Sequence, residues 1–69
     1  MDLAELNARF TYHAPKGDQP ERYQEIRNLG RHFAVVLTEN CPESRELSLA
    51  LTSLEQTVMW ANAVIARRE

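Results

Sequence analysis

The sequence has little of what most small folds use to hold themselves together. It contains one cysteine, Cys41, so it can form neither a disulfide framework nor a cysteine-built metal cluster. With only two glycines, it has no glycine-rich phosphate-binding loop. The chain of 69 residues forms at most one domain, and a core of that size rarely supplies more than about 3–5 kcal/mol. Self-association is therefore the expected source of further stability.

Long hydrophobic runs and an excess of positive charge are also missing. No uncharged run approaches the ~20 residues that a membrane-spanning helix needs, and the first residues lack the apolar stretch of a signal peptide. We therefore expect a soluble cytoplasmic protein. The net charge of −2 argues against binding of DNA or RNA polymers, which needs a broadly basic surface. Two windows without a carboxylate, residues 26–38 and 56–68, still offer local positive potential to a small anion.

The spacing of apolar residues predicts an all-α fold in a single domain over residues 1–69. It comprises a short N-terminal helix and a long antiparallel helical hairpin, with helices expected over residues 2–9, 20–40 and 42–68. The first of these is too short to be stable alone, so it must dock, and Phe10 is its expected contact residue. Asn40 is expected to end the first long helix and to cap the second.

Each long helix carries more apolar surface than one partner helix can cover. Two seams at helical spacing are present: Tyr23, Ile26, Gly30, Phe33 and Leu37 in the first long helix, and Leu47, Leu51, Leu54, Val58, Ala61 and Ile65 in the second. Further apolar residues lie off both lines, among them Leu29 and Trp60. Surplus surface of this kind marks an interface, so we expect a homo-oligomer packed largely through the second long helix. Gly30 on the seam indicates a close approach by another helix or by a ligand.

The hairpin predicts which distant segments meet. Pairing about residue 41 places position 20 near position 62 and position 27 near position 55. The loop at residues 10–19 then lies near Asn62, Arg67 and Arg68. Both carboxylate-free windows are thereby brought to the open end of one molecule, or to subunit junctions there.

Aromatic and cationic side chains gather between residues 10 and 31. They are Phe10, Tyr12, His13, Lys16, Arg22, Tyr23, Arg27 and Arg31. Rings beside guanidinium and ammonium groups suit a ligand with bases to stack and phosphates to neutralise. Tyr12 can stack on a base, and Arg27 and Lys16 can bind phosphate, with Arg31 as an alternative. Asn62 can read a base edge.

Each of these residues also has a simpler interpretation. The rings can fold back onto the helices, and Arg27 and Arg31 can pair with acids one turn away. The Asn62 side chain can make a hydrogen bond at an interface between subunits. Trp60 is assigned to a core or an interface rather than to a ligand site.

No catalytic constellation is present in the sequence. His13 and His32 lack a metal-ligand spacing, and Cys41 has no nucleophile context beyond a helix start. The glutamates have the spacing of solvated helix faces. We therefore expect no enzyme, no metal and no cofactor.

Four segments carry a likeness to known proteins. They are F-T-Y-H-A-P at residues 10–15, R-Y-x-x-I-R at 22–27, C-P-x-S at 41–44 and M-W-A-N-A-V-I-A-R at 59–67. These segments resemble the anti-CBASS protein 2 family, small phage proteins that inhibit bacterial CBASS immunity by sequestering cyclic nucleotides. The resemblance implies a helical homohexamer in the host bacterial cytoplasm. It implies cyclic dinucleotides such as cyclic GMP-AMP in pockets between subunits, and cyclic trinucleotides in separate pockets, all held without cleavage.

The resemblance also implies roles for particular residues. Tyr12 and Arg27 match the family's dinucleotide pocket, although Arg27 stands where the family carries a lysine, which changes the phosphate geometry. His13, Lys16 and Arg31 are candidate further contacts of that pocket. The trinucleotide pocket is assigned to Phe10, Asn62 and Arg67.

Two other functions stay open from the sequence. The apolar stripes suit a helical oligomeric module that binds a host protein. A cyclic-nucleotide phosphodiesterase is the enzymatic alternative.

Overall fold

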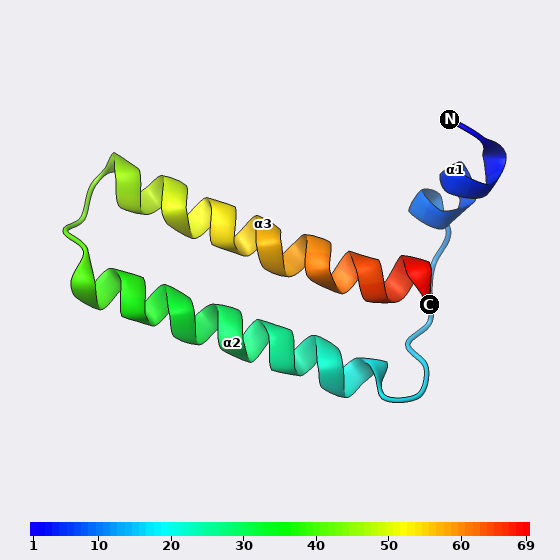
Figure 1. The fold of residues 1–69 in the computed structure, drawn as a ribbon, viewed down its shortest axis with the longest axis horizontal. Helices are drawn as coiled ribbons and strands as arrows, with labels where there is room; N and C mark the ends of the chain where they lie inside the picture. The colour runs from blue at the N-terminus through cyan, green and yellow to red at the C-terminus, as the bar shows by residue number, and fades with distance from the viewer.

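The computed structural model describes residues 1–69 as three helices without a strand (Figure 1). They are α1 (Leu3–Phe10), α2 (Gln19–Asn40) and α3 (Arg45–Arg68). α2 and α3 run antiparallel, and α1 lies near the C-terminal end of α3, so both chain termini lie at the open end of the hairpin. The all-α hairpin expected from the sequence is confirmed.

Local capping explains where α1 and α3 begin. Asp2 Oδ1 accepts a hydrogen bond of 2.8 Å from the backbone N–H of Glu5, as expected for the N-cap of α1. Ser44 Oγ accepts one of 3.1 Å from the backbone N–H of Leu47, so α3 begins at Arg45 rather than at residue 42. Asn40 does not cap α3, because its side chain donates to Val36 O within α2. Residues 41–44 therefore form an irregular connection between the two long helices.

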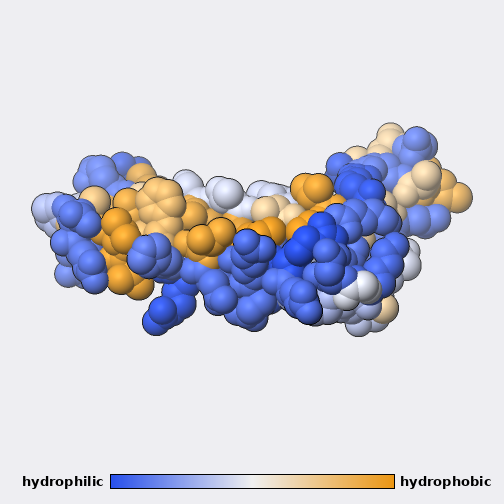
Figure 2. Space-filling view, turned by 60° about the horizontal axis from the view of Figure 1, so that its bottom comes forward, coloured by the Kyte–Doolittle hydropathy of each residue, from blue (hydrophilic) through white to orange (hydrophobic).

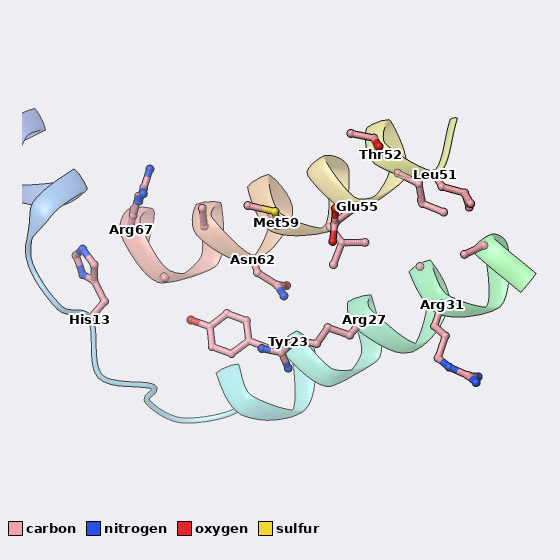
Figure 3. A pocket seen from close by; sticks show the side chains of 16 residues that line it. His13, Tyr23, Arg27, Arg31, Leu51, Thr52, Glu55, Met59, Asn62 and Arg67 are labelled. Carbon is pink, nitrogen blue, oxygen red and sulfur yellow. The ribbon is translucent and has the colours of Figure 1, made fainter. Parts of the chain in front are cut away.

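This longer connection changes the register of the hairpin. A Cβ atom built on Gly30 would lie 2.5 Å from Val58 Cγ2, so position 30 faces position 58. Pairing about residue 41 would have placed it opposite position 52, six positions away, or about 9 Å along the helix axis. The expected register is therefore wrong, and Arg27 lies across from Asn62 instead of position 55 (Figure 3).

The facing sides of α2 and α3 are only half-buried, and no hydrophobic side chain is fully buried. On α2 this side consists of Tyr23, Ile26, Gly30, Ala34 and Leu37. Ala34 takes the seam position expected for Phe33, whose side chain is 55% exposed. The molecule measures 45 × 29 × 12 Å, and a thickness of 12 Å is that of a single helix. Nothing in the single chain covers either broad face of the hairpin.

The exposed area shows how far this chain is from a compact monomer. The chain exposes 5557 Å², roughly 1,100 Å² more than the ~4,450 Å² expected for a folded monomer of its mass. The Cα radius of gyration is 15.2 Å, against about 11 Å for a compact domain of this length. Hydrophobic residues form a band along the hairpin, broad near the α2–α3 connection (Figure 2). The exposed large side chains include Leu29, Phe33 and Val36 on α2, and Leu49, Trp60 and Val64 on α3.

α1 is joined to α3 by charge. Arg68 donates two hydrogen bonds of 2.8 Å to the carboxylate oxygens of Glu5, and Arg9 donates a third of 3.1 Å. Phe10, the expected docking residue, is 84% exposed, and Leu3 is 71% exposed. The apolar side of α1 is therefore also uncovered in the single chain. None of the three helices combines the length and the hydrophobicity needed to cross a bilayer.

Gly30→Ala is expected to destabilise the hairpin, although alanine favours a helix over glycine by about 1 kcal/mol. The new methyl group would meet Val58, whose β-branched side chain has one strongly preferred rotamer in a helix. Overpacking typically costs about 1–3 kcal/mol, so the expected net loss is on the order of 1 kcal/mol. Thermal unfolding followed by circular dichroism measures it.

The control is a double-mutant cycle with Val58→Ala. Because the clash disappears with the Val58 methyl groups, the two substitutions together should cost less than the sum of their separate costs. A higher melting temperature in Gly30→Ala alone would contradict the close approach.

Candidate functional site

A cavity with a volume of about 960 Å³ lies between α2 and α3. We call it the interhelix cleft. Its apolar lining comes mainly from Gly30, Ala34, Leu51, Leu54, Val58 and Met59, and its polar lining includes His13, Tyr23, Arg27, Arg31, Asn62 and Arg67. Its size is within the range of small-molecule sites, about 300–1,000 Å³. Gly30, which has no side chain, lets α2 approach Val58 of α3 closely. Tyr23, Arg27 and Asn62 lie together between the two helices (Figure 3).

Three arginines line the interhelix cleft, and none of them forms an ion pair. The ion pairs of the chain involve Arg9, Arg22 and Arg68 only. The pairing of Arg27 and Arg31 with acids one turn away, which the sequence left open, does not occur. Glu55 is the one carboxylate among the lining residues, so the cleft carries an excess of positive charge. Uncommitted guanidinium groups of this kind suit a ligand with several anionic oxygens.

Asn62 projects from α3 toward Tyr23 and Arg27 on α2 (Figure 3). Its Oδ1 atom is buried and accepts no hydrogen bond. A buried acceptor without a partner costs about 1–3 kcal/mol, and a ligand that supplies an N–H or O–H donor would remove that cost. In the single chain Asn62 lines the same cleft as Arg27.

His13 is the loop residue that reaches the interhelix cleft. Its Nε2 lies 2.7 Å from Ala8 O, which can only accept, so Nε2 carries the hydrogen and donates. In the neutral ring Nδ1 is then an acceptor. The hydrogen bond holds the half-buried imidazole at the end of α1, facing the open end of the cleft (Figure 3).

Tyr12 and Lys16 line neither cavity described here. The Tyr12 side chain is 83% exposed, and Lys16 Nζ donates a hydrogen bond of 3.1 Å to Glu69 O. Both residues lie in the loop of residues 11–18, beside the residues that line the open end of the cleft. The stacking role of Tyr12 stays a prediction.

A second cavity of about 440 Å³ lies between α1 and α3. It is lined by Glu5, Arg9, Phe10, Trp60, Ala63, Val64, Arg67 and Arg68. Phe10 and Arg67, two of the three residues assigned to a trinucleotide pocket, thus come together, whereas Asn62 does not line this cavity. Arg9 and Arg68 bind Glu5, so Arg67 is the one arginine here without an ion pair.

A polar network fastens the open end of the hairpin. Gln19 is the one fully buried residue, with 4% of its surface exposed. Arg22 Nη1 donates a hydrogen bond of 2.8 Å to Glu69 Oε2, and this contact, with one from Gln19, lowers the pKa of Glu69 to about 2. The same contact raises the pKa of Arg22 above its ordinary value. The sequence alone does not indicate that Gln19 is buried, because its burial depends on contacts with the distant end of α3.

The architecture is a helical hairpin with a cationic cleft between its helices, and a family of known proteins shares the hairpin. The family model described as "Acb2/Tad1, hairpin domain" matches residues 2–66, which include nearly all of the three helices. The chain therefore belongs to the Acb2/Tad1 hairpin-domain family, as the resemblance to anti-CBASS protein 2 predicted. It is a family of sponges rather than of enzymes. Comparisons with curated proteins and with solved structures returned no match.

Acid is expected to release α1 from α3. Hydrogen bonds from Arg68 and Arg9 lower the pKa of Glu5 from 4.5 to about 2. Since this pKa is lower in the folded than in the unfolded protein, the contact stabilises docked α1 above a pH of about 4.5 and is lost as the pH falls towards 2. Trp60 lines the cavity beside α1, so its fluorescence should change over this window.

Two matched variants test the assignment to Glu5. Glu5→Gln should remove the acid transition of Trp60, because it removes the titrating carboxyl. Glu69→Gln removes the other carboxyl with a pKa of about 2 and should keep the transition. An unchanged transition in Glu5→Gln would show that another group controls the docking of α1.

Proposed function

We propose that the protein binds cyclic oligonucleotide messengers and sequesters them without cleavage, which blocks the activation of CBASS effectors in the host bacterial cytoplasm. Membership of the sponge family supports this function. The observation that carries it is the interhelix cleft, where Arg27, Arg31 and Arg67 are all free of ion pairs. Arg31 and Arg67 point outward from the edges of the cavity (Figure 3), and an anionic ligand in the cleft would be attracted by all three positive charges.

The chemistry of the cleft matches the parts of a cyclic dinucleotide. Arg27 and Arg31 lie one turn apart on α2, so they can bind phosphate groups with forked donors. The apolar lining offers contact to sugar and base rings, and Tyr23 and His13 offer ring faces at the open end. Asn62 Oδ1 can accept from a base amino group, which makes it a contact of this ligand as well.

We assign a separate site for cyclic trinucleotides to the second cavity. Phe10 and Arg67 supply an exposed ring and an unpaired cation there, and Trp60 adds a second aromatic face. A half-open cavity of about 440 Å³ holds only part of such a ligand, so copies of the chain are expected to complete it.

Self-association is the third part of the proposal. The surplus of roughly 1,100 Å² of exposed surface is on the scale of what each partner of a stable interface buries, about 800 Å². Apolar stripes on α2 and on α3 offer more than one contact face, as a ring or a hexamer requires. Association would also bring Tyr12 and Lys16, which lie outside both cavities of one chain, within reach of a ligand held between subunits.

The chemical fate of the ligand tests sequestration. Cyclic GMP-AMP and a cyclic trinucleotide are each titrated calorimetrically, then released by heat and analysed by liquid chromatography. Intact cyclic ligand in stoichiometric amount is the expected result. Linear nucleotides would support a phosphodiesterase, and the absence of heat with either class would favour the protein-interaction module.

Arg27→Ala is expected to weaken dinucleotide binding and leave the sedimentation coefficient unchanged. Loss of a charge-assisted contact costs on the order of 1.5–3 kcal/mol, or roughly 10- to 150-fold in Kd. Arg45→Ala is the matched control, because Arg45 is an exposed arginine at the other end of the hairpin, outside both cavities and without an ion pair. Equal affinities of Arg27→Ala and Arg45→Ala would remove Arg27 from the site.

A further inference from the structure

The one fully buried residue of this chain is polar. Gln19 begins α2, and 4% of its surface is exposed, whereas every hydrophobic residue is more exposed than that. A buried amide is costly unless its donors and acceptor are satisfied. Its burial therefore points to a role that an apolar residue of the same size would not fill.

The amide of Gln19 lies where three segments meet. Its Oε1 accepts hydrogen bonds from the backbone N–H of Lys16, at 3.1 Å, and from the hydroxyl of Tyr23, at 3.5 Å. Its Nε2 donates to Ile65 O, at 3.3 Å, and to Glu69 Oε1, at 3.1 Å. One side of the amide thus holds the loop and α2, and the other side holds α3. Only a group with both an acceptor and donors can make these contacts together.

The partners of Gln19 are tied to the two walls of the interhelix cleft. Tyr23 lines the cleft from α2, and Lys16 belongs to the loop that carries Tyr12 and His13. Ile65 lies on α3 two residues before Arg67, which lines the cleft from the opposite side. The Gln19 amide therefore helps to set the position of the ring-bearing loop relative to Arg67, together with the contacts that Lys16 and Arg22 make with Glu69.

We propose that Gln19 is a positioning residue for ligand binding: its amide holds the loop of residues 11–18 and Tyr23 against α3, so that the open end of the interhelix cleft is formed before the ligand arrives. This inference rests on the proposed function of the cleft. A loop ordered in advance loses less conformational entropy on binding, and the affinity rises accordingly. Gln19 itself does not line the cleft and is not a ligand contact.

Gln19→Met tests the proposal, because methionine has a similar length and no amide. Gln24→Met is the matched control: Gln24 lies on the same helix, is exposed, and bonds only with Asn28. Three quantities are measured at a temperature well below unfolding. They are the affinity for cyclic GMP-AMP by calorimetry, the helix content and assembly by circular dichroism and sedimentation, and the hydrogen exchange of the Lys16 amide by NMR.

The expected result is a loss of about tenfold in affinity for Gln19→Met, carried by a less favourable binding entropy, with helix content and assembly retained. The Lys16 amide should exchange slowly in the wild-type protein and rapidly in the variant, because the substitution removes the acceptor of its hydrogen bond. A purely structural role would lower the melting temperature and leave the affinity of the folded protein unchanged. Gln24→Met should match the wild-type protein in all three quantities.

Gln19→Asn keeps the inference testable where the methionine variant does not fold. It retains an amide but is one methylene too short to reach both Lys16 and Ile65, so a similar loss of affinity is expected. If a folded Gln19 variant binds cyclic GMP-AMP with wild-type affinity, the positioning role is overturned and the proposed function of the cleft is not affected. A wild-type protein that binds no cyclic dinucleotide overturns the proposed function, and the positioning role with it.

Discussion

Two helices side by side can enclose only one line of side chains, and this limit governs the whole structure. α2 and α3 bury their facing sides by half, and no hydrophobic side chain becomes fully buried. The contacts that hold the open end are polar instead: Gln19 links the loop to α3, and Arg68 links α3 to Glu5 of α1. The Arg68–Glu5 pair is exposed, and exposed ion pairs stabilise weakly on their own. This is why self-association is proposed, with the apolar stripes of α2 and α3 as the surfaces that partner chains would cover.

The same geometry creates the interhelix cleft. Gly30 permits a close approach to Val58 at the middle of the hairpin, while larger side chains on either side keep the cleft open. Arg27 and Arg31 from α2 and Arg67 from α3 are among the residues that line this space, and none of them has an acidic partner. A net acidic chain can thus present a local cationic site, because every carboxylate except that of Glu55 lies outside the lining of the cleft. Capture of a messenger needs only affinity from such a site, which is consistent with a family of sponges.

Helix class, hairpin topology and the close contact at Gly30 could be predicted from the sequence, since periodicity and helix breakers act locally. The register could not, because it depends on whether Asn40 or Ser44 caps α3, and both have suitable side chains. The prediction that Phe33 faces α3 was wrong. The space between α2 and α3 is narrow at this point, so the small Ala34 faces α3 and Phe33 is exposed. The sequence predicted that the two windows without carboxylates meet, and Arg27, Arg31 and Arg67 from these windows line one cavity. It could not predict the hydrogen bonds of Gln19, because they join residues that are distant in the sequence. The roles of Tyr12 and Lys16 stay predictions, because they concern surfaces between chains.

Sedimentation equilibrium over a dilution series, read together with circular dichroism of the same samples, tests the central claim most directly. The account predicts that the protein sediments as an oligomer at high concentration, and that helix content falls in parallel with dissociation because a lone hairpin cannot shelter its apolar surface. A monomer that keeps its full helix content at every dilution would contradict it.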